Sequence, residues 1–259
     1  MTIQAHQIPR TRVLGVNVHM AQMSQAISVI SGWVKNSDIC RFVVVTGMHG
    51  VSEARKDPVF KEILNSADFF LPDGISLVWV GRLRGYSIKT RVPGPDLMWE
   101  YCKIAEQEGH GVFFYGDTEE TLEDLKANLK EHFPQLRICG AISPPFRALT
   151  EEEETSEIQT INESGADVLW VGLGLPKQER WIHNNRERLR VPVAVAVGAA
   201  FRFNSGNLRR APSWIGNNGF EWLWRFLRQP KRMWRRVLID IPWFSIQIAL
   251  ETTGIKKFD

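Results

Sequence analysis

Glycine follows five apolar runs of this sequence, at places where a phosphorylated ligand would need close contact with the backbone. These glycines are Gly47, Gly74, Gly116, Gly172 and Gly198. Glycine lets a backbone approach a ligand closely, and the first N–H groups of a helix that starts there can bind phosphate. Each glycine alone could simply close a turn. The repetition favours a nucleotide or another phosphorylated ligand, and we expect Gly116, Gly172 and Gly174 to line its site.

Asp73 is the best-placed residue for chemistry. It stands between Pro72 and Gly74, directly after an apolar run, where a carboxylate could accept a proton from a substrate hydroxyl. An aspartate that caps the following helix would occupy the same position, so position alone leaves both roles open. His49 also lies just after an apolar run, and we expect it to contact substrate.

Three more polar side chains fall beside the expected ligand. Arg91 begins a loop that leads into a helix, after a basic stretch at 82–90 that could cover a site. An arginine there could equally be an ordinary surface cation. Pro176 suits the first position of a helix, which would put Lys177 and Gln178 in the first turn, next to the ligand.

Several motifs of known chemistry are absent from the sequence. Lys177 stands where a dinucleotide-binding G-x-G-x-x-G would need its third glycine, and no P-loop is present. No G-x-S-x-G elbow of a serine hydrolase occurs. The sequence has no D-x-D, no pair of histidines four residues apart, and three cysteines without C-x-x-C spacing. We therefore expect no bound metal ion, no cofactor and a reducing compartment.

The residues above come after short apolar runs that alternate with helical patterns. Strands are expected at 13–18, 41–45, 68–71, 112–115, 136–142, 168–171 and 193–197. Helices are expected at 21–36, 51–65, 95–107, 119–132, 151–164 and 176–188. Runs such as 193–197 are apolar on both faces, which is typical of a parallel sheet covered by helices on both sides. This pattern predicts a doubly wound, Rossmann-like α/β fold, whose ligands bind beyond the carboxyl ends of the strands.

Charge is distributed unevenly along the 259 residues. Residues 1–201 carry 21 basic and 25 acidic side chains, whereas residues 202–259 carry 11 basic and 4 acidic side chains and five of the ten tryptophans. We expect a catalytic domain at 1–201 and a basic, helical, membrane-associating appendage at 202–259. The charge of the appendage predicts a polyanionic partner, and both membrane headgroups and nucleic acid fit it.

The segment 221–238 is amphipathic if it is helical. Its arginines then gather on one face and its tryptophans and other apolar residues on another, although Pro230 must end or kink the helix. These arginines are Arg225, Arg228, Arg232, Arg235 and Arg236. The alternative is a helix pair docked on the catalytic domain with its tryptophans in the core. No apolar run reaches the ~18 residues of a membrane-spanning helix, and no secretory signal is visible.

Taken together, these residues resemble the WecG/TagA/CpsF family, also called glycosyltransferase family 26. The resemblance runs from about Val13 to Arg236, with its motifs in the order of the family. The matching pieces are Leu71-Pro72-Asp73-Gly74, Arg91-Val92-x-Gly94-x-Asp96-Leu97, Gly172-Leu173-Gly174-x-Pro176-Lys177-Gln178-Glu179, Val197-Gly198-Ala199-Ala200-Phe201, Arg210-Ala211-Pro212-x-Trp214 and Glu221-Trp222-Leu223-x-Arg225, ahead of Pro230-x-Arg232.

The resemblance implies an inverting transfer of a sugar from a UDP-sugar to a polyprenyl-diphosphate-linked saccharide. It implies a Rossmann-like fold without the metal-binding aspartate pair, in keeping with the missing D-x-D. The base of the family falls on Asp73, and its conserved threonine falls on Thr46. Its pocket residues fall on Arg91 and Gln178. The arginines of its C-terminal appendage fall on Arg225, Arg232 and Arg235.

This sequence departs from the family at one informative position. Teichoic-acid members carry an asparagine two residues after the threonine, and here that residue is Met48, followed by His49. A thioether cannot replace the amide as a partner for a sugar hydroxyl, so the departure bears on an N-acetylmannosamine donor. His49 is the expected substitute for the lost polar contact.

The resemblance also implies partners and a location. We expect a UDP-sugar donor, a polyprenyl-diphosphate-linked acceptor and an anionic membrane surface, with no nucleic acid, and homo-oligomer formation stays open. The expected location is peripheral, on the cytoplasmic face of the plasma membrane, in the synthesis of cell-surface polysaccharide. Two other classes are a soluble nucleotide-dependent enzyme, disfavoured by the missing fingerprint, and a nucleic-acid-binding module, for which no recognised motif is present.

Overall fold

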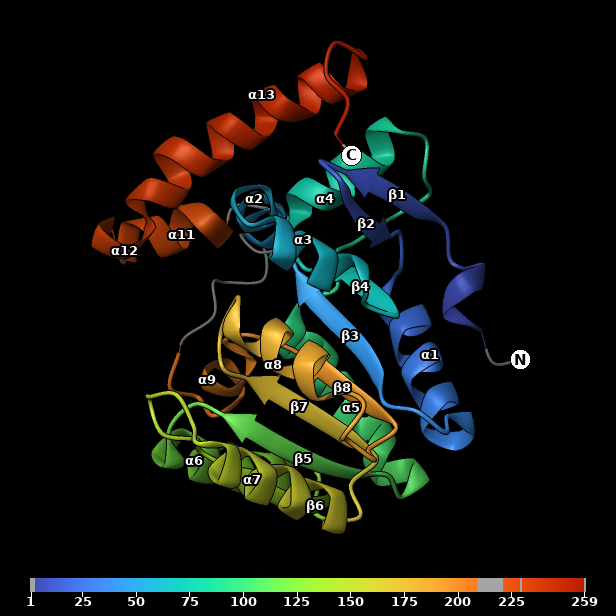
Figure 1. Cartoon of the computed structure of the whole chain (residues 1–259), viewed down its shortest axis with the longest axis vertical. Coiled ribbons are helices and arrows are strands. Elements are labelled where there is room, and N and C mark those ends of the chain that lie inside the picture. Colours follow the sequence, from blue (N-terminus) through green and yellow to red (C-terminus); the bar gives the residue numbers. More distant parts are fainter. Residues whose placement is uncertain (1–2, 209–220, 229, 259) are drawn as a thin grey trace.

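A single parallel sheet organises the chain. The structure, a computed structural model, describes residues 3–208, 221–228 and 230–258. Six strands lie in the order β4-β3-β8-β7-β5-β6, and every neighbouring pair is parallel (Figure 1). They are β3 (Arg41–Thr46), β4 (Phe69–Pro72), β5 (Gly111–Gly116), β6 (Arg137–Ile142), β7 (Val168–Gly172) and β8 (Val193–Ala196). The predicted α/β fold with a mainly parallel sheet is confirmed.

Helices cover both faces of this sheet. They are α1 (Met23–Asn36), α2 (Met48–Lys56), α3 (Pro58–Asn65), α4 (Ile75–Leu83), α5 (Gly94–Glu108), α6 (Glu119–His132), α7 (Glu151–Glu163), α8 (Lys177–Asn185) and α9 (Ala200–Asn204). Residues of β3 alternate between two cores, because successive side chains of a strand point to opposite faces. Phe42 and Val44 belong to the core that α2, α3 and α8 cover, and Val43 and Val45 to the core under α1 and α5.

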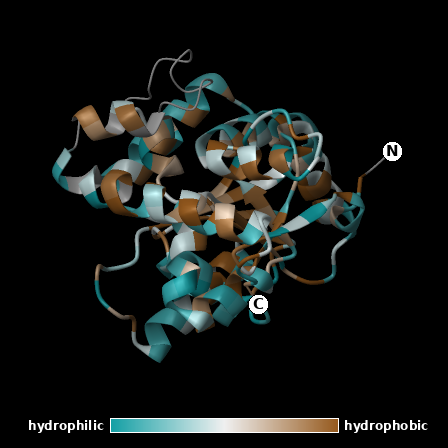
Figure 2. Ribbon diagram, turned by 90° about the horizontal axis from the view of Figure 1, so that it is seen from above, coloured by the Kyte–Doolittle hydropathy of each residue, from teal (hydrophilic) through white to brown (hydrophobic). Residues whose placement is uncertain are grey.

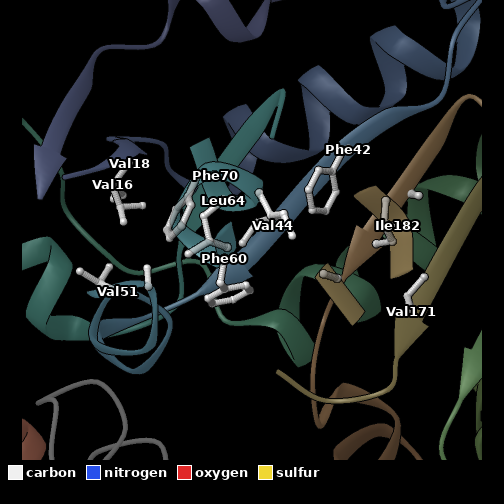
Figure 3. Packing of buried hydrophobic residues seen from close by; sticks show 14 of the residues in the cluster. Val16, Val18, Phe42, Val44, Val51, Phe60, Leu64, Phe70, Val171 and Ile182 are labelled. Carbon is white, nitrogen blue, oxygen red and sulfur yellow. The ribbon is translucent and has the colours of Figure 1, made fainter. Parts of the chain in front are cut away.

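The apolar strands explain why the sheet is buried on both sides. All residues of β4, β5, β7 and β8 are buried. Figure 2 shows hydrophobic segments gathered inside the molecule and hydrophilic ones around them. In one core, Phe60 of α3 and Ile182 of α8 lie over Phe42 and Val44 of β3 (Figure 3).

Two expected elements divide where the backbone turns. The run at 13–18 is not one strand, because it contains the turn of an antiparallel hairpin. The hairpin consists of β1 (Arg10–Val13) and β2 (Val16–His19), and a short 3-10 helix, η1 (Ala5–Gln7), precedes it. Leu14 and Gly15 form the turn with φ of 48° and 86°. The expected helix at 51–65 is two helices, because Pro58 starts a new helix and the Asp57 side chain caps it by accepting from the Phe60 N–H.

The C-terminal helices attach at one end of this domain. They are α11 (Glu221–Arg228), α12 (Pro230–Arg235), the π-helical turn η2 (Arg236–Asp240) and α13 (Ile241–Thr252). Phe244 and Ile248 of α13 are buried in the core that includes α2. The Arg55 guanidinium lies 4.2 Å from the centre of the Trp243 ring. Within the described residues, no helix is long and apolar enough to cross a membrane.

The domain also continues past the boundary expected at residue 201. Helix α9 packs against α5 and α6. The Asn204 amide donates to the Pro95 carbonyl at 2.9 Å, and the Asn128 amide donates to the Asn204 carbonyl at 2.6 Å. Residues 202–204, which open the expected appendage, therefore pack with the helices that cover the sheet.

Candidate active site

The order of the strands predicts a ligand crevice at the carboxyl edge of the sheet. The chain leaves β3 toward β4 on one side and leaves β5 toward β6 on the other, while β8 and β7 lie between them. In open α/β sheets, ligands bind where neighbouring connections diverge in this way. The loops after β3, β4, β5, β7 and β8 meet at this edge, and they contain the glycines that the sequence singled out.

Close backbone packing holds the loops after β3 and β4 together. The Asp73 N–H donates to the Thr46 carbonyl at 3.1 Å. A Cβ atom on Gly47 would lie 3.0 Å from the backbone N and Cα of Gly74. The two glycines are therefore needed for this approach, which sets the Asp73 side chain, half-buried, beside the end of β3. Thr46 is buried, and its side chain fills the space that a Cβ on Gly50 would need.

Arg91 joins the same part of the crevice. The Val92 N–H donates to the Pro72 carbonyl at 2.8 Å, which extends the contact between this loop and β4. The Arg91 guanidinium donates to the Asp73 carbonyl over a long 3.5 Å. Three residues on, a Cβ atom on Gly94 would lie 3.0 Å from the Val197 carbonyl oxygen. The structure therefore brings the loops that carry Thr46, Asp73 and Arg91 together.

The family asparagine position lies in the apolar core. Met48 is buried at the start of α2 and belongs to the core with Val51 and Leu77. His49, the next residue, is half-buried in the first turn of α2, directly after the Gly47 contact. The side chain at position 48 therefore fills the core, and His49 is the polar residue of this turn.

The loop after β5 forms the other side of the crevice. A Cβ atom on Gly116 would lie 2.6 Å from the backbone carbon of Gly172, and Gly116 has a φ of 128°. The next side chain, Asp117, receives two N–H groups of the Arg202 guanidinium at 2.8–3.1 Å. This bidentate pair raises the pKa of Arg202 by hydrogen bonding and charge. The Ser143 hydroxyl also donates to the Asp117 carbonyl at 2.7 Å.

Gln178 lies between the two sides and connects the central loops. Its side chain is 1% exposed. Its amide oxygen accepts the Gly174 N–H at 3.1 Å and the Gly198 N–H at 3.0 Å. Its amide nitrogen donates to Glu179 at 2.9 Å. In this arrangement Gln178 fixes the loops after β7 and β8, so its contribution to a substrate site acts through the position of these loops.

Glu179 is a buried carboxyl group beneath this clamp. It is 0% exposed, and its second carboxyl oxygen has no hydrogen-bond partner among the described residues. Burial raises its pKa to about 7, against the smaller opposing effects of the Gln178 hydrogen bond and its own backbone. The group can therefore remain neutral near pH 7.

The remaining expected residues lie in different settings. Gly174 has a φ of 79°, which favours glycine in the turn before α8. Lys177 is exposed in the first turn of α8. Arg235 is exposed in α12. Arg225 and Arg232 fall in α11 and α12, and their side chains lie outside the described residues.

Sequence reasoning missed two features of this edge. The boundary expected at residue 201 puts Arg202 in the appendage, although its partner Asp117 lies two residues after the expected strand at 112–115. In the sequence, Glu179 resembles an ordinary acidic residue in a first helical turn. No spacing in the sequence reveals its burial, which depends on how α8 packs on β3, β7 and β8.

Comparison with known proteins gives consistent matches over most of the chain. The glycosyl transferase WecG/TagA/CpsF family model matches residues 11–257. A protein of Bacillus spizizenii is 36% identical over 76% of this chain and 74% of its own, and one of Bacillus subtilis is 30% identical over 79% and 77%. A protein of Staphylococcus aureus is 28% identical over 95% of this chain and 94% of its own.

The relatives share one name, and the matched region contains the whole crevice. Each of the three is named an N-acetylglucosaminyldiphosphoundecaprenol N-acetyl-β-D-mannosaminyltransferase. The matched residues include both sides of the carboxyl edge and the C-terminal helices up to α13. The chain therefore belongs to the WecG/TagA/CpsF family of glycosyltransferases.

Proposed function

We propose that this glycosyltransferase moves a sugar from a UDP-sugar to the N-acetylglucosamine of a polyprenyl-diphosphate-linked acceptor, with inversion. The observation that carries this proposal is the grouping of Asp73 with Thr46 and Arg91 on one side of a crevice whose other side consists of glycine loops. The names of the relatives supply the acceptor class. They also specify a β linkage, which inversion at an α-linked donor would form.

In the proposed reaction, Asp73 acts as the general base. Its carboxylate takes the proton of the acceptor hydroxyl as that oxygen attacks the anomeric carbon of the donor. The bond from this carbon to the diphosphate breaks, and UDP leaves with the electron pair. Thr46 and Arg91 would position the groups that react, since their loops are fixed to the backbone of Asp73.

Negative charge grows on the diphosphate as it leaves, and this charge needs stabilisation. The N–H groups of the loops after β5, β7 and β8 can supply part of it. We assign the rest to Arg225, Arg232 and Arg235 of the C-terminal helices, because guanidinium groups bind phosphate through two hydrogen bonds. The absence of a D-x-D from the sequence supports a reaction that requires no divalent metal.

Position 48, which bears on the donor sugar, is the point at which this chain differs from teichoic-acid members. Met48 is buried, and we propose that His49 contacts the sugar instead of the family asparagine. The basic, tryptophan-rich C-terminal helices would hold the enzyme at the cytoplasmic face of the membrane, where anionic lipids attract basic residues.

A donor panel tests this function. The full chain would be mixed with a short-chain polyprenyl-diphosphate N-acetylglucosamine and several UDP-sugars, with UDP release and product mass as readouts. We expect one donor to give a disaccharide product, with the same rate in EDTA as with Mg²⁺. UDP release that does not require the acceptor, or no product with any donor, would contradict the transfer. Activity that returns only with a divalent metal would contradict the metal-independent step.

A further inference from the structure

At one end of the molecule, two segments that contain no acidic side chain lie next to each other. No Asp or Glu precedes Asp38, and residues 74–95 contain four basic side chains and no acidic one. These two segments lie side by side. The Arg84 guanidinium donates to Thr11 Oγ1 at 3.0 Å, and the Tyr86 hydroxyl donates to the Arg10 carbonyl at 3.1 Å. The hairpin β1–β2 and the loop after α4 therefore form one surface region.

The end of the chain joins this region. Glu251 of α13 accepts the Leu14 N–H at 3.1 Å and forms an ion pair with Arg84. This contact places the exposed residues 253–257, which follow α13, near the hairpin (Figure 1). Exposed cations from all three segments occupy this end. They are Arg10, Arg12, Arg82, Lys89, Lys256 and Lys257.

Large apolar side chains are exposed among these cations. Trp79 is 56% exposed and Leu83 is 65% exposed, and both are on α4. Residues four apart lie on the same face of a helix, so they present one apolar strip. Ile255 is also exposed, at 75%. We call these three residues and the six cations the basic face.

The opposite end of the molecule has the opposite charge. Helices α6 and α7 carry eleven carboxylates and two lysines. Figure 1 places them at the far end from α4, β1 and α13. An anionic surface would attract the basic face and repel the end formed by α6 and α7, which gives the molecule a preferred orientation.

We propose that the basic face is a second membrane-binding surface, formed by the catalytic domain itself, which docks on an anionic phospholipid bilayer. This inference rests on the proposed function, because a lipid-linked acceptor with a single sugar would require the active site to lie close to the membrane. Only one sugar and a diphosphate separate the reacting hydroxyl from the lipid. Helix α4 starts at Ile75, directly after Asp73 and Gly74, and Trp79 lies about 6 Å further along its axis. Trp79 and Leu83 insert at the interface, and the cations contact the headgroups.

Vesicle binding of the full chain tests this surface. The double variant Trp79→Ser/Leu83→Ser would be sedimented with vesicles of equal parts phosphatidylglycerol and phosphatidylcholine. We expect its partition coefficient to fall about tenfold. A charge variant, Arg10→Gln/Arg12→Gln/Lys89→Gln, should lose binding to these vesicles by a similar factor. The control is Phe146→Ser, because Phe146 is 82% exposed in the loop between β6 and α7, and it should bind as the unmodified chain does.

Three outcomes decide the proposal. Selective loss of vesicle binding in both basic-face variants supports it. Unchanged binding in both variants overturns it and leaves the C-terminal helices as the membrane surface. Unchanged vesicle binding with a lower oligomeric mass in Trp79→Ser/Leu83→Ser also overturns it, because the strip would then be a contact between copies of the chain. Transfer to a water-soluble acceptor is measured in parallel. If the unmodified chain lacks that transfer, the proposed function fails, and vesicle binding still decides the role of the basic face.

Discussion

Each side of the crevice has an aspartate just after a strand, but the surroundings of the two carboxylates differ. On the β5 side, the Asp117 side chain is only 4% exposed and receives both arms of the Arg202 guanidinium. On the β4 side, Asp73 is half-buried between the loops after β3 and β4, with Arg91 reaching its backbone carbonyl. A neutralised carboxylate on one side and the proposed base on the other suit two different ligands.

This difference favours the β5 side for the proposed diphosphate. Asp117 is balanced by Arg202, and burial raises the pKa of Glu179 beneath the central loops to about 7. The side with the glycine loops therefore carries little net negative charge to repel a diphosphate. A hydroxyl that must lose a proton is better placed near Asp73. The comparison predicts that substitutions on the β4 side change turnover, and that those on the β5 side change binding and stability.

The largest effect is expected for Asp73→Asn. The amide keeps the shape of the side chain but cannot take a proton, so turnover should fall about 10²-fold or more. The KM for the donor should stay within about threefold, because the loops after β5, β7 and β8 are unchanged. Steady-state kinetics with the donor of choice measure both values. Near-normal turnover would rule out Asp73 as the base and would remove the main contrast between the two sides.

The next largest effect, a loss of stability, is expected for the substitution of a glycine on the β5 side. Gly116→Ala would place a Cβ atom 2.6 Å from the backbone of Gly172, which cannot move without separating β5 from β7. Gly165→Ala is the matched control, because Gly165 also has a positive φ, 69°, but no atom within 4 Å of the added Cβ. The control should lose about 1–2 kcal/mol from its backbone conformation, and Gly116→Ala about 3 kcal/mol more. Urea unfolding of both variants measures this. Equal losses would show that the two loops are not in close contact.

The sequence was enough to predict which loops meet at the carboxyl edge, because each of these loops follows an apolar strand. Thr46, Asp73 and the glycines follow apolar runs, and the carboxyl ends of parallel strands meet at one edge, so their convergence follows from the pattern. The strand order also brings the loops after β7 and β8 between the two outer pairs of strands. The hairpin at 10–19 was missed because the turn at Leu14 and Gly15 lies within a run of apolar residues.

The buried carboxyl group of Glu179, beneath the loops after β7 and β8, should make the stability of the chain depend on pH. Its pKa is about 7 in the folded chain against 4.5 as the ordinary value. Folding then favours the protonated form, so the contribution is fully present below about pH 4.5 and is lost as the pH rises through 7. Glu179→Gln keeps an oxygen that accepts from Gln178 but cannot ionise. Relative to the unmodified chain, its free energy of unfolding should increase by up to about 3 kcal/mol between pH 4 and pH 8. A difference that does not change with pH would mean that Glu179 is not held neutral.

Residues that pair across long stretches of sequence could not be predicted. Asp117 and Arg202 are 85 residues apart, and their pairing depends on α9 packing between α5 and α6. The same holds for Glu251 of α13, which contacts Arg84 and Leu14. A boundary drawn from charge alone at residue 201 therefore separated Arg202 from the domain to which it is bound.

The smallest effect is expected where the ion pair of the β5 side is broken. The Arg202 side chain is 45% exposed, but the Asp117 side chain is only 4% exposed. Arg202→Gln leaves that carboxylate with the Thr118 N–H as a donor, so the variant should lose about 1–2 kcal/mol of stability. The loss leaves the Asp117 carboxylate unbalanced near the proposed diphosphate, so the donor KM should rise severalfold while kcat changes little. Asp117→Asn alone should leave the donor KM near that of the unmodified chain, because it removes the negative charge and keeps the Arg202 cation. In the double variant, the neutral amide that replaces the Asp117 carboxylate no longer repels the ligand, so its KM should lie below that of Arg202→Gln. If the KM effects of the two substitutions simply multiply, the charge of Asp117 is not felt by the donor, and the neutralised side of the crevice does not hold its diphosphate.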